Sequence, residues 1–133
     1  MSQANVDIVK SLYEAFGKGD VPAVLAAMDP GIVWNEAENF PYADRNPYVG
    51  PTAIVEGVFA RLGGEWEYFK LALEEVLDAG DTVVSRGRYD AAYKKTGGKI
   101  NAQFVHIWKL RDGKVLTFQQ YADTLQVAKA LGG

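Results

Sequence analysis

The sequence predicts an α+β fold in which helices come first and a meander of antiparallel strands follows. Up to residue 62, apolar side chains recur mainly at steps of three and four, as on one face of a helix. Beyond residue 69, long apolar runs are separated by glycine-containing turns, which is typical of strands. At 133 residues the chain has the length of one domain, which we place at residues 1–133.

The expected helices each have an apolar face and a start or stop signal. We expect them over residues 4–16, from 20 to about 28, from 51 or 52 to about 62, and from 123 or 124 to 131. Gly17 stops the first, and Asp20 caps the second, which has Pro22 in its first turn. Asp123 is expected to cap the last one.

The expected strands cover residues 32–37, 69–77, 82–94, 100–110 and 115–121. The turns between the last four contain Gly80-Asp81, Thr96-Gly97-Gly98 and Asp112-Gly113. Residues 38–50 form a long loop, of the kind that often serves as a lid or binding loop. We expect one strongly curved sheet that wraps around the helices.

The composition argues against several classes of protein. The net charge is −3 and the basic residues are scattered, so no nucleic-acid partner is expected. Cysteine is absent and His106 is the only histidine, which removes disulfides, thiolate nucleophiles and histidine-rich metal sites. The first residues lack the features of a secretory signal, and no stretch approaches the ~20 apolar residues of a membrane span. We therefore expect a cytoplasmic protein without membrane contact, metal or cofactor.

His106 is the most informative candidate for chemistry. It lies between Phe104 and Trp108 on an expected strand, and these three side chains share one face. A titratable ring among aromatic side chains suits an apolar reaction pocket. It equally suits an inert core in which neighbours bond the ring nitrogens. The sequence leaves both interpretations open.

The partners of His106 depend on the length of the turn that follows its strand. A three-residue turn, Arg111–Gly113, places His106 opposite Phe118 and Phe104 opposite Gln120. A two-residue turn would instead bring the alternate side chains to this face: Gln119, Tyr121 and Asp123. We expect the three-residue turn.

The same choice exists at the preceding turn, Thr96–Gly98. A three-residue turn there sets Arg88 opposite His106 and Asp90 opposite Phe104. With both three-residue turns, apolar walls and a few polar groups converge as in a small-molecule site. The alternative for Arg88 and Asp90 is an ion pair on the solvent face.

The chain resembles the SnoaL-like branch of the nuclear transport factor 2-like superfamily. Four segments carry the resemblance: residues 13–20, 29–34, 49–56 and 104–115, in that order. It implies a cystatin-like α+β barrel, a cone in which the curved sheet wraps three N-terminal helices around a pocket. It also implies a homodimer formed through the outer sheet face. The superfamily includes ketosteroid isomerase, polyketide cyclases, limonene-epoxide hydrolase and non-enzymes, so the fold implies no reaction.

The resemblance can be followed residue by residue. Arg88-Tyr89-Asp90 resembles the Arg-x-Asp motif of limonene-epoxide hydrolase, and His106 resembles the histidine of SnoaL-type cyclases. The catalytic aspartate of both groups falls on Gln120, which cannot take a proton. The base of ketosteroid isomerase falls on Asn35, and Tyr13 lies near its oxyanion tyrosine. The complete catalytic set of these enzymes is therefore not present.

Glu36 is a candidate base among the remaining carboxylates, which are Glu36, Glu38, Asp90 and Asp123. It shares strand parity with Trp34, and burial beside that ring would raise its pKa. The candidate catalytic residues are His106, Glu36 and Asp90, with His106 as acid, base or hydrogen-bond donor and either Glu36 or Asp90 as the base. The expected ligand-binding residues are Tyr13, Trp34, Asn35, Phe59, Arg88, Phe104, Trp108, Phe118 and Gln120. The leading hypothesis is a cofactor-free acid–base enzyme that acts on a hydrophobic carbonyl-bearing or cyclic substrate. The alternative, favoured by Gln120, is a non-catalytic ligand-binding or dimerisation module.

Overall fold

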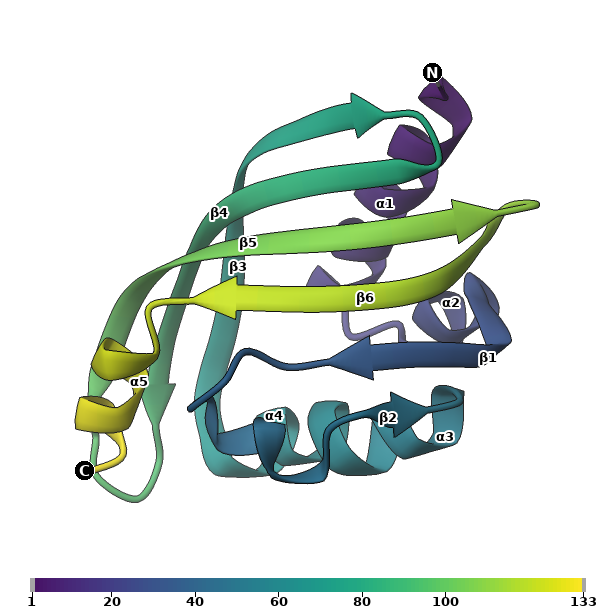
Figure 1. Cartoon of the computed structure of the whole chain (residues 1–133). Coiled ribbons are helices and arrows are strands. Elements are labelled where there is room, and N and C mark those ends of the chain that lie inside the picture. The colour runs from purple at the N-terminus through teal and green to yellow at the C-terminus, as the bar shows by residue number, and fades with distance from the viewer. Residues whose placement is uncertain (1, 133) are drawn as a thin grey trace.

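The computed structural model describes residues 2–132 and confirms the α+β fold (Figure 1). The helices are α1 (Gln3–Gly17), α2 (Val21–Ala26), α3 (Pro51–Ile54), α4 (Ala60–Glu65) and α5 (Thr124–Ala130), with a 3-10 helix η1 (Pro41–Arg45) and a π-helical segment η2 (Val55–Phe59). The strands are β1 (Met28–Asn35), β2 (Tyr48–Val49), β3 (Trp66–Ala79), β4 (Thr82–Tyr93), β5 (Lys99–Arg111) and β6 (Lys114–Ala122).

The strands form one curved, open sheet in the order β2-β1-β6-β5-β4-β3. Strands β1 and β6 are parallel, and the other neighbours are antiparallel. The N-terminal helices and the α3–η2–α4 run cover the concave face of the sheet (Figure 1). The predicted curved, mainly antiparallel sheet around these helices is therefore confirmed. Among the described residues, no helix combines the length and the apolar character needed to cross a bilayer.

The third expected helix is continuous but not uniform. Between α3 and α4 its backbone widens into the π-helical segment η2, a feature often found near functional sites. Gly57 in this segment packs against the ring of Tyr48, where an added Cβ would lie 2.2 Å from the ring carbon Cε1. The absence of a side chain at this position therefore allows β2 to lie close to the helix.

Local signals start two of the helices as the sequence predicts. The Asp20 carboxylate accepts a hydrogen bond from the Ala23 backbone N–H at the start of α2. Asp123 accepts one from the Gln126 backbone N–H, which confirms its expected role as the cap of α5. The helix starts therefore follow from side chains that satisfy free backbone donors.

The three-residue turn expected between β5 and β6 is wrong. Arg111 pairs with Lys114, so the turn contains only Asp112 and Gly113. Both have positive φ angles, 52° and 77°, as a type I′ hairpin turn requires.

A one-residue bulge in β6 follows this turn and shifts the pairing once more. His106 lies opposite Gln120, and Phe104 lies opposite Ala122. The expected partners were Phe118 and Gln120, respectively. The difference is two residues, which is one full side-chain repeat, so the expected face is retained.

The three-residue turn expected after β4 is also wrong. The backbone N–H of Tyr93 donates to the Gly98 carbonyl at 2.8 Å, so residues 94–97 form a four-residue turn. Ser85 thereby lies opposite His106, three positions away from the expected partner. An odd shift exchanges the two faces of a strand. This exchange has direct consequences for the site.

Candidate functional site

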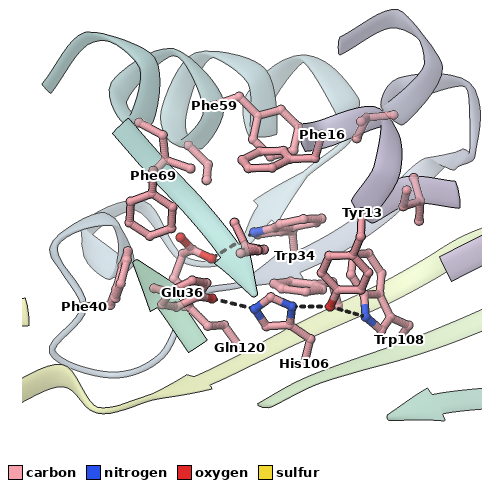
Figure 2. A pocket seen from close by; sticks show the side chains of 17 residues that line it. Tyr13, Phe16, Trp34, Glu36, Phe40, Phe59, Phe69, His106, Trp108 and Gln120 are labelled. Carbon is pink, nitrogen blue, oxygen red and sulfur yellow. Dashed lines mark hydrogen bonds between the residues drawn. The ribbon is translucent and has the colours of Figure 1, made fainter. Parts of the chain in front are cut away.

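A cavity lies between the concave face of the sheet and the helices that cover it (Figure 2). Its free volume is about 60 Å³ once the gaps between atoms and the open solvent are left out, so the space between the side chains is narrow. Aromatic rings and aliphatic side chains make up most of the wall, and only a few polar groups reach it. This combination is typical of small-molecule sites.

Most residues expected at the site line this cavity: Tyr13, Trp34, Glu36, Phe59, His106, Trp108, Phe118 and Gln120. They come from α1, β1 and its following residue, η2, β5 and β6. Parallel pairing of β1 with β6 places Trp34 beside Phe118. The two rings stack with their centroids 3.7 Å apart. One wall of the cavity is therefore a pair of stacked rings.

Arg88 and Asp90 do not line the cavity, and their expected placement there is wrong. The four-residue turn puts both on the outer face of β4, where Asp90 is exposed. Arg88 instead donates a hydrogen bond of 2.9 Å to the Asn101 carbonyl on the neighbouring strand. The side chain between them, Tyr89, points inward and is buried.

Asn35 and Phe104 also lie outside the lining. Asn35 points away from the cavity because its neighbours Trp34 and Glu36 occupy the inner side of the chain. Phe104 is buried beside the site and stacks on His106 with a centroid distance of 4.2 Å. Phe104 therefore packs against the His106 ring but does not line the cavity.

Tyr89 is the main site residue that the sequence reasoning did not identify. Its signal was present in strand alternation, but only the correct turn length assigns it to the inner face. Other lining residues that were not singled out as site residues are apolar: Leu12, Phe16, Val24, Phe40, Val58, Leu62, Phe69 and Leu71. Their apolar character alone does not distinguish a cavity wall from a filled core.

Two tyrosine hydroxyls hold the ring of His106. Tyr13 Oη lies 2.5 Å from Nδ1 (Figure 2), and Tyr89 Oη lies 2.5 Å from Nε2. Gln120 Nε2 donates to Tyr89 Oη at 2.8 Å, and Gln120 Oε1 accepts from the Ala37 backbone N–H at 3.0 Å. The histidine is thus the centre of a polar chain that runs across the cavity wall.

Burial keeps this histidine neutral, because desolvation lowers its pKa to about 3. A neutral imidazole has one N–H donor and one acceptor nitrogen. With the hydrogen on Nδ1, His106 donates to Tyr13, Tyr13 donates to Ser85 Oγ at 2.5 Å, and Tyr89 donates to Nε2. Every hydroxyl hydrogen then has an acceptor, since Ser85 reaches the His106 carbonyl at 3.5 Å. The opposite tautomer leaves the Tyr89 hydroxyl hydrogen without one.

Glu36 is the ionisable group that faces the cavity from the end of β1. Its Oε2 accepts a hydrogen bond of 3.0 Å from Trp34 Nε1. No fully buried side-chain oxygen or nitrogen of the described residues lacks a partner. The second carboxyl oxygen, which has no such bond, must therefore retain some accessible surface. Desolvation raises the pKa of Glu36 to about 7, although the Trp34 hydrogen bond and the Arg61 charge oppose the rise.

The backbone around Glu36 is fixed by the side chain of Asn46. Its Oδ1 accepts from the Glu36 N–H at 3.0 Å, and its Nδ2 donates to the Glu36 carbonyl at 2.8 Å. The carboxyl group is thus presented to the cavity from an ordered backbone.

Within residues 2–132, no cluster of three or more histidine, cysteine, aspartate or glutamate side chains is arranged to hold a metal ion. A carboxyl group whose pKa lies near 7 can take up or release a proton near neutral pH.

The SnoaL-like domain family matches residues 9–118 of the chain. A nuclear transport factor 2-like protein from Burkholderia thailandensis E264 is 38% identical, with 98% of each chain covered and a TM-score of 0.91. TerC, crystallised with polyporic acid, is 25% identical, with 98% of this chain and 100% of its own covered and a TM-score of 0.87.

A proposed SnoaL-like polyketide cyclase from Jannaschia sp. CCS1 is 21% identical. It covers 100% of this chain and 96% of its own with a TM-score of 0.85, and this likeness concerns the fold alone. No curated protein matches the chain. The likenesses extend over almost all of the sequence, including the elements that form the cavity.

Proposed function

The chain belongs to the SnoaL-like domain family, and we propose that it binds a hydrophobic carbonyl-bearing or cyclic small molecule and removes a proton from it with Glu36. The observation that carries this proposal is the Glu36 carboxyl group. It is buried, it retains one oxygen towards an apolar cavity, and its pKa is about 7. A base whose pKa lies near the working pH is suited to proton transfer.

The cavity favours a flat and uncharged ligand. Its wall contains the stacked pair Trp34 and Phe118 together with further rings, and the space between them is narrow. Among the residues that the structure describes, no lysine or arginine lines it, so an anionic group inside would face the Glu36 carboxylate without a counter-charge. The co-crystallisation of TerC with polyporic acid supports a small organic molecule as the ligand in a related chain.

In this proposal His106 acts through Tyr89 rather than on the substrate. Both ring nitrogens already bond tyrosine hydroxyls, and the low pKa keeps the ring uncharged. In the tautomer that carries the ring hydrogen on Nε2, Nδ1 accepts a hydrogen bond from the Tyr13 hydroxyl, and the Tyr89 hydroxyl hydrogen becomes free. Tyr89 can then donate to a substrate carbonyl oxygen that gains negative charge as Glu36 takes a proton from the adjacent carbon. In a conjugated substrate, return of that proton from Glu36 to a different carbon of the enolate shifts the double bond and completes an isomerisation with no other reactant.

Deuterium exchange tests this function without knowledge of the natural substrate. Hydrophobic cyclic ketones and enones are incubated with the protein in D2O, and loss of the hydrogen next to the carbonyl is followed by NMR. Wild-type protein is expected to accelerate exchange in at least one compound, and Glu36→Gln is expected to slow it by about 100-fold or more. Asp90→Asn is the matched control, since it makes the same change on the exposed face.

Equal exchange by wild type and Glu36→Gln would contradict the proposal.

A second candidate, binding without turnover, is favoured by one observation. Gln120 occupies an inner position on β6 with both ends of its amide bonded, to Ala37 and Tyr89, and it supplies no second titratable group. This second function would be established by compounds that bind equally to wild type and Glu36→Gln and whose hydrogens exchange with neither protein.

A further inference from the structure

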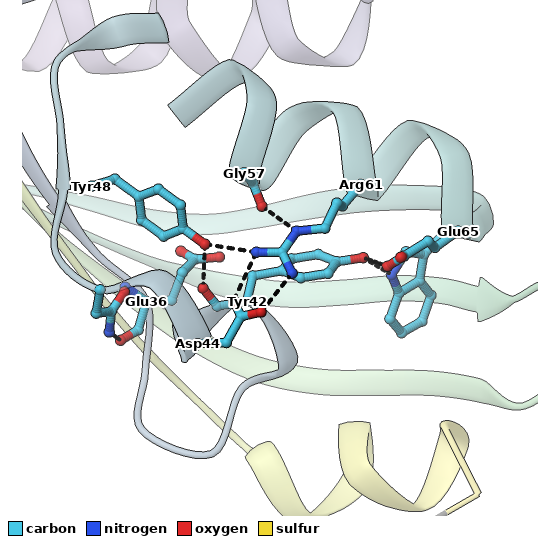
Figure 3. A network of polar contacts seen from close by, with 9 residues as sticks. Glu36, Tyr42, Asp44, Tyr48, Gly57, Arg61 and Glu65 are labelled. Atoms are coloured by element: carbon cyan, nitrogen blue, oxygen red, sulfur yellow. Dashed lines mark hydrogen bonds and ion pairs between the residues drawn. The ribbon is translucent and has the colours of Figure 1, made fainter. Parts of the chain in front are cut away.

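Arg61, in α4, makes an unusually complete set of contacts just outside the cavity (Figure 3). Its Nη1 and Nη2 donate to the two carboxylate oxygens of Asp44 at 3.0 and 2.8 Å. Nη2 also donates to Tyr48 Oη at 2.8 Å, and Nε donates to the Gly57 carbonyl in the π-helical segment at 2.5 Å. The Arg61 side chain is 18% exposed and that of Asp44 is 53% exposed, so the bidentate pair has a largely covered cation and an acidic partner that faces solvent.

These contacts join helix α4 to the segment that follows Glu36. Asp44 and Tyr42 belong to η1, and the guanidinium lies over the Tyr42 ring at 4.4 Å from its centroid. The Tyr48 hydroxyl, held by Arg61, donates to the Tyr42 carbonyl at 2.5 Å. Arg61 therefore anchors the Ala37–Tyr48 segment to α4, together with the hydrogen bond of 2.6 Å that Tyr42 Oη donates to Glu65 at the end of the same helix.

The same cation acts on the carboxyl group at the start of this segment. Arg61 does not line the cavity, but its positive charge favours ionised Glu36 and opposes the effect of burial on the Glu36 pKa. The other groups around Glu36 supply no cation: Tyr89 on β4 and Tyr48 on β2 are phenols, His106 on β5 is neutral, and Gln120 on β6 is an amide. Asp44 partly offsets the Arg61 charge.

We propose that Arg61 is a positioning residue for Glu36, which it serves in two ways: it anchors the Ala37–Tyr48 segment to α4 and supplies positive charge to the carboxyl group from outside the cavity. The inference rests on the proposed function in that Glu36 is the working base. The effect of Arg61 on Glu36 can nevertheless be measured independently of catalysis, because it is a property of the ligand-free protein. If Arg61 acts only as a structural anchor, the Glu36 titration midpoints of two variants should change differently than if Arg61 also acts through its charge.

Arg61→Gln removes the cation together with its contacts to Asp44 and Tyr48. Asp44→Asn keeps the cation, removes the neighbouring anion and weakens the anchor. If the charge of Arg61 acts on Glu36, the first variant raises the Glu36 titration midpoint by roughly half a pH unit or more, and the second leaves it unchanged or lowers it. If Arg61 only holds the segment, both variants disturb Glu36 in the same direction. Arg61→Lys keeps the charge and loses the bidentate geometry, so its midpoint should stay near that of the wild type.

The measurement is a carbon-13 NMR titration of the Glu36 carboxyl in each ligand-free variant, with Glu36→Gln used to assign the signal. A rise in Arg61→Gln without a rise in Asp44→Asn supports the proposal. An unchanged midpoint in Arg61→Gln, or a rise in both variants, overturns it. Should Arg61→Gln fail to fold, Arg61→Lys and Asp44→Asn decide, because a rise in either contradicts the charge effect. Since no turnover is measured, failure here is distinguishable from failure of deuterium exchange.

Discussion

Trp34 Nε1 donates a 3.0 Å hydrogen bond to the carboxyl group of Glu36, its neighbour on the same face of the chain. This contact orients one carboxyl oxygen and leaves the other available to the cavity. It also partly offsets the cost of burying the carboxylate, because the indole N–H stabilises the charged form. A glutamine at this position can accept the same hydrogen bond without carrying charge.

Glu36→Gln is therefore expected to stabilise the protein at high pH. The folded-state pKa of Glu36 is about 7, raised from 4.5, so the folded state binds the proton more tightly than the unfolded state. The resulting stabilisation is fully present below pH 4.5 and is lost as the pH rises through 7. At pH 8 the free energy of unfolding of Glu36→Gln should exceed that of the wild type by up to about 3 kcal/mol.

Urea unfolding at several pH values measures this difference directly. His106 contributes in the opposite direction, since its pKa is lowered to about 3 and its contribution is lost as the pH falls from 6.5 towards that value. The contribution of His106 is the same in both proteins, so it cancels when the unfolding free energy of the wild type is subtracted from that of Glu36→Gln. A difference that does not grow between pH 4 and pH 8 would show that Glu36 is not protonated in the folded protein near neutrality.

Tyr89→Phe is expected to destabilise the protein and to weaken the polar chain around His106. The change leaves His106 Nε2 and Gln120 Nε2 without their buried partner. Each such loss costs about 1–3 kcal/mol. Tyr121→Phe is the matched control, because Tyr121 is 54% exposed and should change the unfolding free energy by less than about 0.5 kcal/mol. Equal effects in the two variants would argue against the hydrogen-bond chain.

Arg88→Ala and Asp90→Ala are expected to leave ligand binding unchanged. Both side chains lie on the outer face of β4, separated from the cavity by the sheet. Ligand affinity, followed by quenching of tryptophan fluorescence, should stay within about twofold of wild type. A tenfold loss in either variant would show that the outer face of β4 takes part in binding.

Ligand charge should matter in a pH-dependent way. Of two compounds with the same ring skeleton, the one with a carboxylate is expected to bind at least about tenfold more weakly than the neutral ketone at pH 8, because Glu36 is ionised there. The penalty should decrease below pH 6 as Glu36 takes up its proton. Calorimetric titrations at both pH values check this, and tighter carboxylate binding at pH 8 would contradict the assigned charge of the cavity.

The sequence predicts the fold better than it predicts the site, for a physical reason. Side chains repeat every two residues along a strand, so a turn that is longer by one residue exchanges the faces of everything beyond it. At Asp112-Gly113 the error of one residue was compensated by a bulge, and Phe118 and Gln120 stayed on the face of His106. At residues 94–97 no bulge compensated, and Arg88 was assigned to the wrong face.

Glu36 could be placed from the sequence because it needs no long-range register. It follows Trp34 by two residues on a short strand whose inner face is apolar, so parity alone puts both side chains in the cavity. Tyr89 and Arg61 could not be placed in this way. The role of Tyr89 depends on the β4–β5 register, and that of Arg61 on the position of η1 relative to α4. Both depend on contacts between distant segments that local patterns do not encode.

The central claim is that a carboxyl group facing the cavity changes its protonation near neutral pH. The most direct test is a carbon-13 NMR titration of the Glu36 carboxyl in the wild-type protein. The structure predicts a midpoint near pH 7. A midpoint close to 4.5, the ordinary value for a glutamate, would contradict the account and remove Glu36 as the base.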